Sequence, residues 1–119
     1  SDDTVGHPST RLTWQKEDDN ITKTWEEALT YCEGLPLAGY SNWRLPNATE
    51  LQSIVDYSVA NPAIDSSVFP NANSSGYWSS TTVGVATGNA VNVNFGTGFV
   101  AIGSGKTTKF YVRCVRGGQ

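Results

Sequence analysis

The spacing of apolar and polar residues predicts helices in the first half of the chain and strands on either side of them. Alternating or β-branched stretches, which are typical of strands with one buried face, occupy residues 11–15, 77–81, 90–95, 99–102 and 109–116. Glycine-rich turns separate the last three stretches and predict hairpins at residues 96–98 and 103–108. The order of strand, helix, helix and several strands predicts an α+β fold, with two helices packed on antiparallel sheets and with long loops.

Two segments have the apolar period of a helix. The first follows Thr24, whose spacing to Glu27 is that of a capping box, and Gly34 should end it. One face of this helix combines the apolar residues Trp25, Ala28, Leu29 and Cys32. The second helix follows Asn47 and should end near Tyr57. Its apolar stripe consists of Leu51, Ile54 and Val55.

The last predicted strand, residues 109–116, presents two faces. The apolar face, which we expect to point into the core, consists of Phe110, Val112 and Cys114. The polar face, which we expect to point outward, consists of Lys109, Tyr111 and Arg113.

The chain is long enough for one domain with one core. Residues 1–10 show no clear pattern and predict a flexible lead-in, so the domain is expected to span residues 11–119. Residues 58–76 form a long loop rich in Asn, Ser and Pro, and such a loop is usually functional or well tethered. The four tryptophans are interpreted as core residues. No apolar run approaches the roughly 18 residues that a membrane span needs.

Charge is distributed unevenly along an acidic chain. The net charge is −3, yet residues 61–119 contain one acid and four bases. These bases lie close together in sequence, and we call them the basic strip: Lys106, Lys109, Arg113 and Arg116. Such residues often protect a strand edge, and they also bind the sulfate and carboxylate groups of anionic polysaccharides. The acidic total counts against a nucleic-acid partner.

Several motifs resemble sites of chemistry but lack the context that the chemistry needs. GSGKTT at residues 103–108 is close to a phosphate-binding loop, but Val100 stands where that motif needs glycine, and a strand pattern follows instead of a helix. The one histidine, His7, lies in the expected lead-in. The acidic stretch at residues 17–20 could hold calcium but is more typical of a solvated loop. We therefore expect no catalysis, no metal site and no cofactor.

The two cysteines, Cys32 and Cys114, both belong to faces that are expected to point inward. Their separation matches no zinc-binding spacing. The residues alone leave two readings open, a pair of buried thiols or one disulfide. A disulfide would indicate an oxidising compartment.

Five motifs occur in an order that resembles a known family. They are Leu12-Thr13-Trp14-Gln15, Thr24-Trp25-Glu26-Glu27-Ala28, Asn42-Trp43-Arg44-Leu45-Pro46 with Glu50-Leu51, Tyr77-Trp78-Ser79-Ser80 and Val112-Arg113-Cys114-Val115-Arg116-Gly117. Together they resemble the Lcl C-terminal domain family, which is named for the collagen-like adhesin of Legionella. The resemblance implies a C-type-lectin-like fold, a disulfide between Cys32 and Cys114, and a secreted or cell-surface location. It also implies a homotrimer that binds sulfated glycosaminoglycans.

Sequence and resemblance together favour an extracellular, non-catalytic adhesion domain. It would bind sulfated polysaccharide or a host-surface glycan through Lys106, Lys109, Tyr111, Arg113 and Arg116. One alternative is a protein-binding module that uses residues 58–76 and 82–89 as variable loops. Another alternative is a structural trimerising cap with no ligand of its own. Neither a nucleic-acid partner nor membrane insertion is expected.

Overall fold

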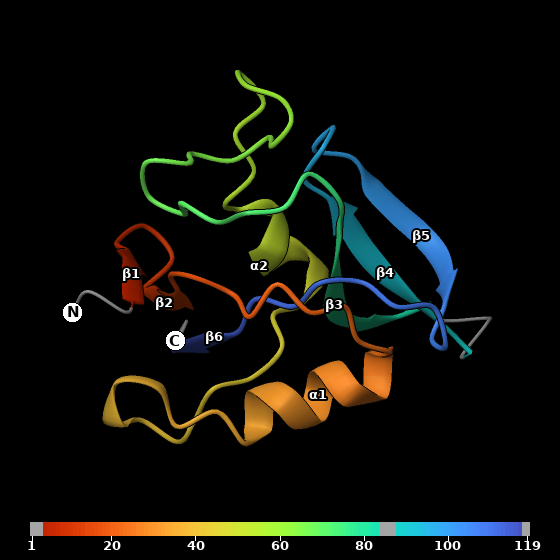
Figure 1. The fold of residues 1–119 in the computed structure, drawn as a ribbon, viewed down its shortest axis with the longest axis horizontal. Coiled ribbons are helices and arrows are strands. Elements are labelled where there is room, and N and C mark those ends of the chain that lie inside the picture. Colours follow the sequence, from red (N-terminus) through yellow and green to blue (C-terminus); the bar gives the residue numbers. More distant parts are fainter. Residues whose placement is uncertain (1–3, 84–87, 118–119) are drawn as a thin grey trace.

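The computed structural model describes residues 4–83 and 88–117, which form two three-stranded antiparallel sheets and two α-helices (Figure 1). The elements are β1 (Thr4–His7), β2 (Leu12–Gln15), α1 (Trp25–Glu33), the 3₁₀ turn η1 (Leu37–Gly39), α2 (Ala48–Gln52), β3 (Gly76–Thr82), β4 (Asn89–Asn94), β5 (Val100–Gly105) and β6 (Val115–Gly117). This arrangement confirms the predicted α+β class, and the C-type-lectin-like assignment stays an expectation from the resemblance. Part of the expected lead-in (residues 1–3) and part of the second predicted loop (residues 84–87) lie outside the described residues.

The first sheet has the order β1-β2-β6 and includes a strand that the sequence pattern did not predict. β1 pairs antiparallel with β2, which places Val5 opposite Trp14, and Val5 packs against a buried apolar cluster. The Nδ1 atom of His7 lies 2.7 Å from the hydroxyl of Thr10 in the turn that follows. The expected flexible lead-in is therefore wrong for residues 4–7. A strand this short does not show enough alternation to be recognised.

The second sheet has the order β3-β4-β5 and confirms the predicted hairpin at residues 96–98. Gly98 has a φ of +83°, and a Cβ at this position would lie 3.0 Å from the ring of Tyr57. Both observations explain the glycine, because a side chain here would be strained and crowded. The long loop between α2 and β3 is tethered to this turn, since the Asn61 amide donates to the Gly96 carbonyl at 3.1 Å.

Helix α1 begins and ends where the sequence predicted. The Thr24 side chain accepts from the Glu27 amide at 3.3 Å, and the Glu27 carboxylate accepts from the Thr24 amide at 2.9 Å. Gly34 follows the last helical residue. In the last turn, Cys32 forms a disulfide with Cys114, which confirms the implied pairing and decides between the two readings of the cysteines.

Helix α2 begins after its predicted cap, Asn47, but ends at Gln52, five residues before the predicted end. Leu51 and Ile54 are nevertheless buried, as their period predicted. The turn that continues from the helix keeps Ile54 directed at the core, because its amide still donates to the Leu51 carbonyl.

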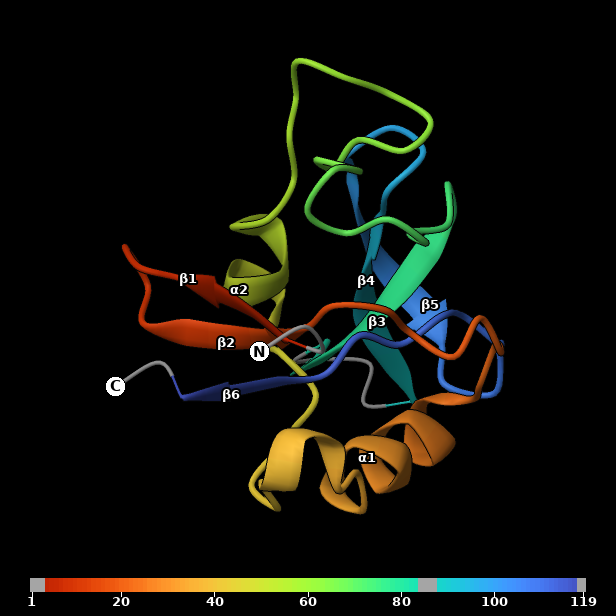
Figure 2. The same cartoon turned by 60° about the vertical axis from the view of Figure 1, so that its left-hand side comes forward.

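The predicted last strand is wrong over most of its length. β6 begins only at Val115 and pairs with β2, so no hairpin joins it to β5. Residues 106–114 instead cross the molecule beside α1, and single bridges connect them to the residues before α1 and to β3 (Figure 2). The four consecutive residues 112–115 are all buried. Val115 belongs to one apolar cluster, and Val112 and Cys114 belong to the other. The segment is therefore covered on both sides, and strand alternation does not describe it.

Candidate functional site

The structure divides the basic strip into separate positions. Lys106 and Lys109 lie beside the start of α1, whereas Arg116 lies in β6 beyond the end of that helix (Figures 1 and 2). The helix has 9 residues, a length of roughly 13 Å at 1.5 Å per residue. Arg113 lies inside the molecule. The four bases therefore do not form one continuous surface.

Lys106 and Lys109 form what we call the lysine corner. The Lys106 carbonyl accepts a hydrogen bond from the Trp25 amide at 3.0 Å, and the Lys106 ammonium lies 3.9 Å from the centre of the Trp25 ring. That ring is itself held in place, because its Nε1 donates to the Ser79 carbonyl at 2.9 Å. Lys109 is exposed. The corner thus offers one ammonium positioned over an aromatic ring and a second at the surface.

Acidic side chains limit the positive charge of the lysine corner. Glu26 and Glu27 occupy the first turn of α1. The hydrogen bond from the Thr24 amide lowers the pKa of Glu27, and the nearby Lys109 lowers it further. Glu27 is therefore ionised at neutral pH. The corner can hold an anion by direct contact with its ammonium groups, but it attracts anions only weakly from a distance.

Arg116 provides a second pairing of a cation with an aromatic ring. Its guanidinium carbon lies 3.6 Å from the centre of the Tyr40 ring, and its Nε donates to Asn42 at 2.8 Å. Tyr40 is 47% exposed. The neighbouring Arg44 donates two hydrogen bonds of 2.7 Å to Glu50, so its charge is already compensated. Arg116 therefore offers a ligand a cation that is held over an exposed aromatic ring.

Arg113 is buried, which corrects the prediction that it faces solvent. The residue is 1% exposed. Its Nη1 donates to the carbonyls of Gln15 and Lys16 at 2.7 and 2.6 Å, and its Nη2 lies 3.6 Å from the Asp18 carboxylate. The error comes from applying strand alternation to a segment that is not a regular strand. An extended polysaccharide cannot reach Arg113, which instead connects the segment after β2 to the last segment of the chain.

Tyr111 is also directed at the core, and the prediction that it points outward is wrong. Its ring centre lies 5.6 Å from that of Tyr77, and Tyr111 packs against the apolar cluster to which Tyr77 belongs. Its backbone is fixed by the Gly76 carbonyl, which accepts from the Tyr111 amide at 3.0 Å. Tyr111 therefore contributes to packing and does not share a face with Lys109.

Asp18, Tyr77 and Arg113 form a buried polar network. The Tyr77 hydroxyl donates to the Asp18 carboxylate, which also accepts from the Asn20 amide at 3.0 Å. Burial raises the pKa of Asp18, although Tyr77 and Arg113 oppose that rise. Burial and the adjacent carboxylate raise the pKa of Tyr77 to about 12. Asp18 thus serves an internal role, and the expectation of a solvated acidic loop is wrong for this residue.

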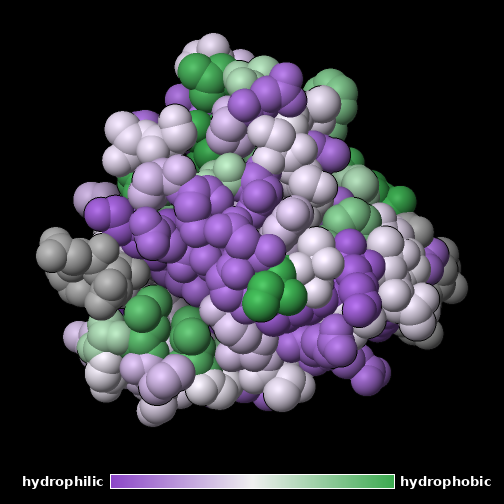
Figure 3. All heavy atoms as spheres, viewed as in Figure 1, coloured by the Kyte–Doolittle hydropathy of each residue, from purple (hydrophilic) through white to green (hydrophobic). Residues whose placement is uncertain are grey.

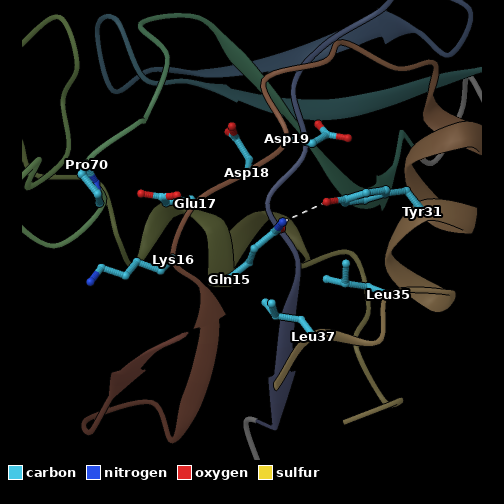
Figure 4. Close-up of a pocket in the computed structure, with 9 residues that line it drawn as sticks. All are labelled: Gln15, Lys16, Glu17, Asp18, Asp19, Tyr31, Leu35, Leu37 and Pro70. Carbon is cyan, nitrogen blue, oxygen red and sulfur yellow. Dashed lines mark hydrogen bonds between the residues drawn. The ribbon is translucent and has the colours of Figure 1, made fainter. Parts of the chain in front are cut away.

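A cleft of about 460 Å³ opens beside this network (Figure 4). It is lined by Gln15, Lys16, Glu17, Asp18, Asp19, Tyr31, Leu35, Leu37 and Pro70. Figure 3 shows a hydrophilic band over the segment after β2 and a hydrophobic patch over the loop after α1. The acidic wall disfavours an anionic polysaccharide. The sequence pointed to the acids but not to the cleft, because Tyr31 and the two leucines complete it from another part of the chain.

Within residues 4–83 and 88–117, no three His, Cys, Asp or Glu side chains come close enough together to hold a metal ion. Trp14, Trp43 and Trp78 are buried, which confirms their prediction as core residues. Trp25 is half-buried beneath Lys106, so one face of its ring belongs to the lysine corner.

Comparison with known proteins identifies a family for most of the chain. The family model described as the Lcl C-terminal domain matches residues 3–116, which is nearly the whole chain. No curated protein matches the chain. Neither α-helix in the described part of the chain has the length and hydrophobicity needed to cross a membrane.

Proposed function

The chain belongs to the Lcl C-terminal domain family, and from this premise we propose that it is a non-catalytic adhesion domain that binds sulfated or otherwise anionic polysaccharide. The family takes its name from an adhesin, and this relation indicates a location outside the cell or at its surface. The ligand would be a glycosaminoglycan-like chain or another host-surface glycan. The observation that carries the proposal is the pairing of a cation with an aromatic ring at each end of α1: Lys106 on Trp25, and Arg116 on Tyr40.

Such a pairing suits a sulfated sugar for two reasons. The cation binds the sulfate group, as a point charge for Lys and through two parallel hydrogen bonds for Arg. At the second pairing, the 47% exposed Tyr40 ring also offers apolar surface to the C–H groups of the sugar. Because the ring already restrains the cation, less side-chain entropy is lost when the ligand binds. Lys109 adds a third charge beside the first pair.

One chain offers few cations, and Glu26 and Glu27 offset part of their charge. A single domain is therefore expected to bind weakly. The proposal includes a homotrimer, because three copies would present nine such cations to one polysaccharide chain, and multivalency raises the overall affinity without new contacts.

The proposal also includes the absence of catalysis. Asp18 and Tyr77 have raised pKa values, and perturbed titratable groups are frequent in active sites. Here both groups are buried and bonded to each other, which supports a structural role.

Retention on a heparin column across a salt gradient tests the proposal. The test variant is Lys106→Gln/Lys109→Gln, and the matched control is Arg11→Gln/Lys16→Gln, which removes the same charge from the two ends of β2, outside the lysine corner. Arg116→Gln tests the second pairing, with Lys16→Gln as its single-charge control. We expect the test variants to elute at lower salt than the control. If test and control variants eluted at equally reduced salt concentrations, total charge alone would explain the retention. If the unmodified protein were not retained even at low salt, the proposal would be contradicted.

A further inference from the structure

One part of the molecule carries acids and exposed apolar side chains but no base. The sequence contains no Lys or Arg from residue 45 to residue 105, whereas it contains Glu50, Asp56 and Asp65 there. This stretch forms α2, the long loop at residues 53–75 and the second sheet, which occupy the centre, the top and the right-hand side of Figure 1. All eight bases of the chain lie in the other segments.

Three large apolar side chains are exposed at the tip of this part. Tyr57 is 67% exposed, Val59 46% and Phe99 72%. They belong to neighbouring segments, because the Tyr57 ring lies against Gly98 in the turn before Phe99. Hydrophobic side chains are visible there in Figure 3, over the long loop and the end of the β4–β5 hairpin. Clusters of exposed aromatic residues are typical of surfaces that bind other molecules.

A cleft of about 450 Å³ lies within the same loop and contains both aspartates. It is lined by Asp56, Val59, Ala60, Asn61, Pro62, Ile64, Asp65 and Ser66. The Oδ1 atom of Asp56 accepts from the amide and hydroxyl of Ser58, and Oδ1 of Asp65 accepts in the same way from Ser67. These bonds lower the pKa of Asp56. They also orient both carboxylates, so two fixed negative charges stand beside the aliphatic wall of the cleft.

We propose that this surface, which we call the loop-tip surface, docks a basic segment of a partner protein. An Arg or Lys side chain enters the cleft, where its aliphatic stem lies along Val59 and Pro62 and its charge meets Asp56 and Asp65. An apolar side chain beside it packs against Tyr57 and Phe99. The charge of the surface selects the partner, because 61 consecutive residues without a base disfavour an acidic segment or a sulfated polysaccharide. This interaction is independent of polysaccharide binding at the lysine corner.

An NMR titration of the ¹⁵N-labelled protein at low salt tests the proposal, with an acetylated and amidated Arg-Leu-Lys-Tyr-Arg peptide as the probe. We expect amide shifts at residues 56–66 and 97–99. Asp56→Asn/Asp65→Asn should weaken binding by roughly tenfold, since two exposed ion pairs are lost. Asn keeps an oxygen that can accept from Ser58 and Ser67, so the loop should retain its shape. Phe99→Ser should also weaken binding, because the apolar contact is lost.

The matched control is Glu26→Gln/Glu33→Gln, which removes two exposed charges from α1 and should leave the affinity unchanged. Three outcomes would overturn the proposal: equal weakening in this control, shifts confined to the cleft around residues 15–19, or no shifts at millimolar peptide. Binding of a Glu-Leu-Glu-Tyr-Glu peptide with the same affinity would also overturn it, because charge would then not select the partner. Loss of heparin retention has no bearing on these outcomes, so the two proposals fail separately.

Discussion

Replacing Arg113 with Ala is expected to destabilise the fold without removing a surface ligand group. The guanidinium lies 3.6 Å from the Asp18 carboxylate and donates to two carbonyls of the segment after β2. Its Cζ atom lies 4.8 and 5.8 Å from the ring centres of Phe69 and Tyr77. Ala would remove all these contacts and would leave the Asp18 carboxylate buried without its cation.

The size of the effect follows from the burial of the pair, since both side chains are at most 1% exposed. Removing one partner of a buried ion pair costs about 3–5 kcal/mol, mainly because the other charge stays uncompensated. Domains of this kind are stable by about 5–15 kcal/mol, so Arg113→Ala should lose a large part of the free energy of unfolding. Asp18→Asn should rescue part of this loss. The double variant should therefore be more stable than the sum of the single effects predicts, by about 1 kcal/mol or more.

Urea unfolding, followed by tryptophan fluorescence, gives the four free energies of this cycle. Heparin retention of the Arg113→Ala protein, measured where it is still folded, completes the assay and should match that of the unmodified protein. The reasoning would be refuted if Arg113→Ala changed the free energy of unfolding by less than about 1 kcal/mol and weakened retention as much as the lysine-corner variant does. Arg113 would then act at the surface, as strand alternation predicted.

The pH dependence of stability provides two more predictions. Hydrogen bonds from Arg44 lower the pKa of Glu50, so its contribution to stability is present above the ordinary value of 4.5 and is lost as the pH falls through the folded pKa. Glu50→Gln should therefore lower the free energy of unfolding by roughly 0.5–1 kcal/mol at neutral pH and leave it unchanged at low pH. The effect is small because solvent screens the Arg44 side chain, which is 40% exposed. A difference between the two proteins that stays constant with pH in urea unfolding would contradict this prediction. The pKa of Tyr77, raised by burial and by Asp18 to about 12, gives a contribution to stability that is full below pH 10 and is lost as the pH rises to 12. This contribution is roughly 3 kcal/mol. Tyr77→Phe should lack this alkaline loss, and parallel curves for the two proteins in alkaline urea unfolding would show the argument to be wrong.

Features whose causes are close together in sequence were predictable. Thr24 and Glu27 lie three positions apart and determine the start of α1 through two reciprocal hydrogen bonds. The hairpin at residues 96–98 depends on glycines within the turn itself. In the same way, Cys32 was correctly assigned to the buried face of its helix, because the helical period depends on local geometry alone.

Features that depend on distant segments were not predictable. Arg113 bonds to the Gln15 carbonyl, 98 positions away, and this contact exists only because residues 106–114 cross the molecule instead of forming a hairpin. Lys106 and Arg116 are separated for the same reason, since a crossing segment carries them to opposite ends of α1. A lysine and an arginine ten positions apart look like neighbours on a strand, and only the tertiary path of the chain shows that they are not.

The affinity for heparin as a function of salt, compared with the affinity for desulfated heparin, tests the central claim most directly. If the two ammonium groups of the lysine corner contact sulfate, raising the salt from 50 to 200 mM should weaken binding by about tenfold per domain, by the counterion-release relation for two contacts. Desulfated heparin should bind much more weakly at every salt concentration. An affinity that does not change with salt, or that is equal for both polysaccharides, would contradict the account of this chain as a domain that binds anionic polysaccharide through its surface cations.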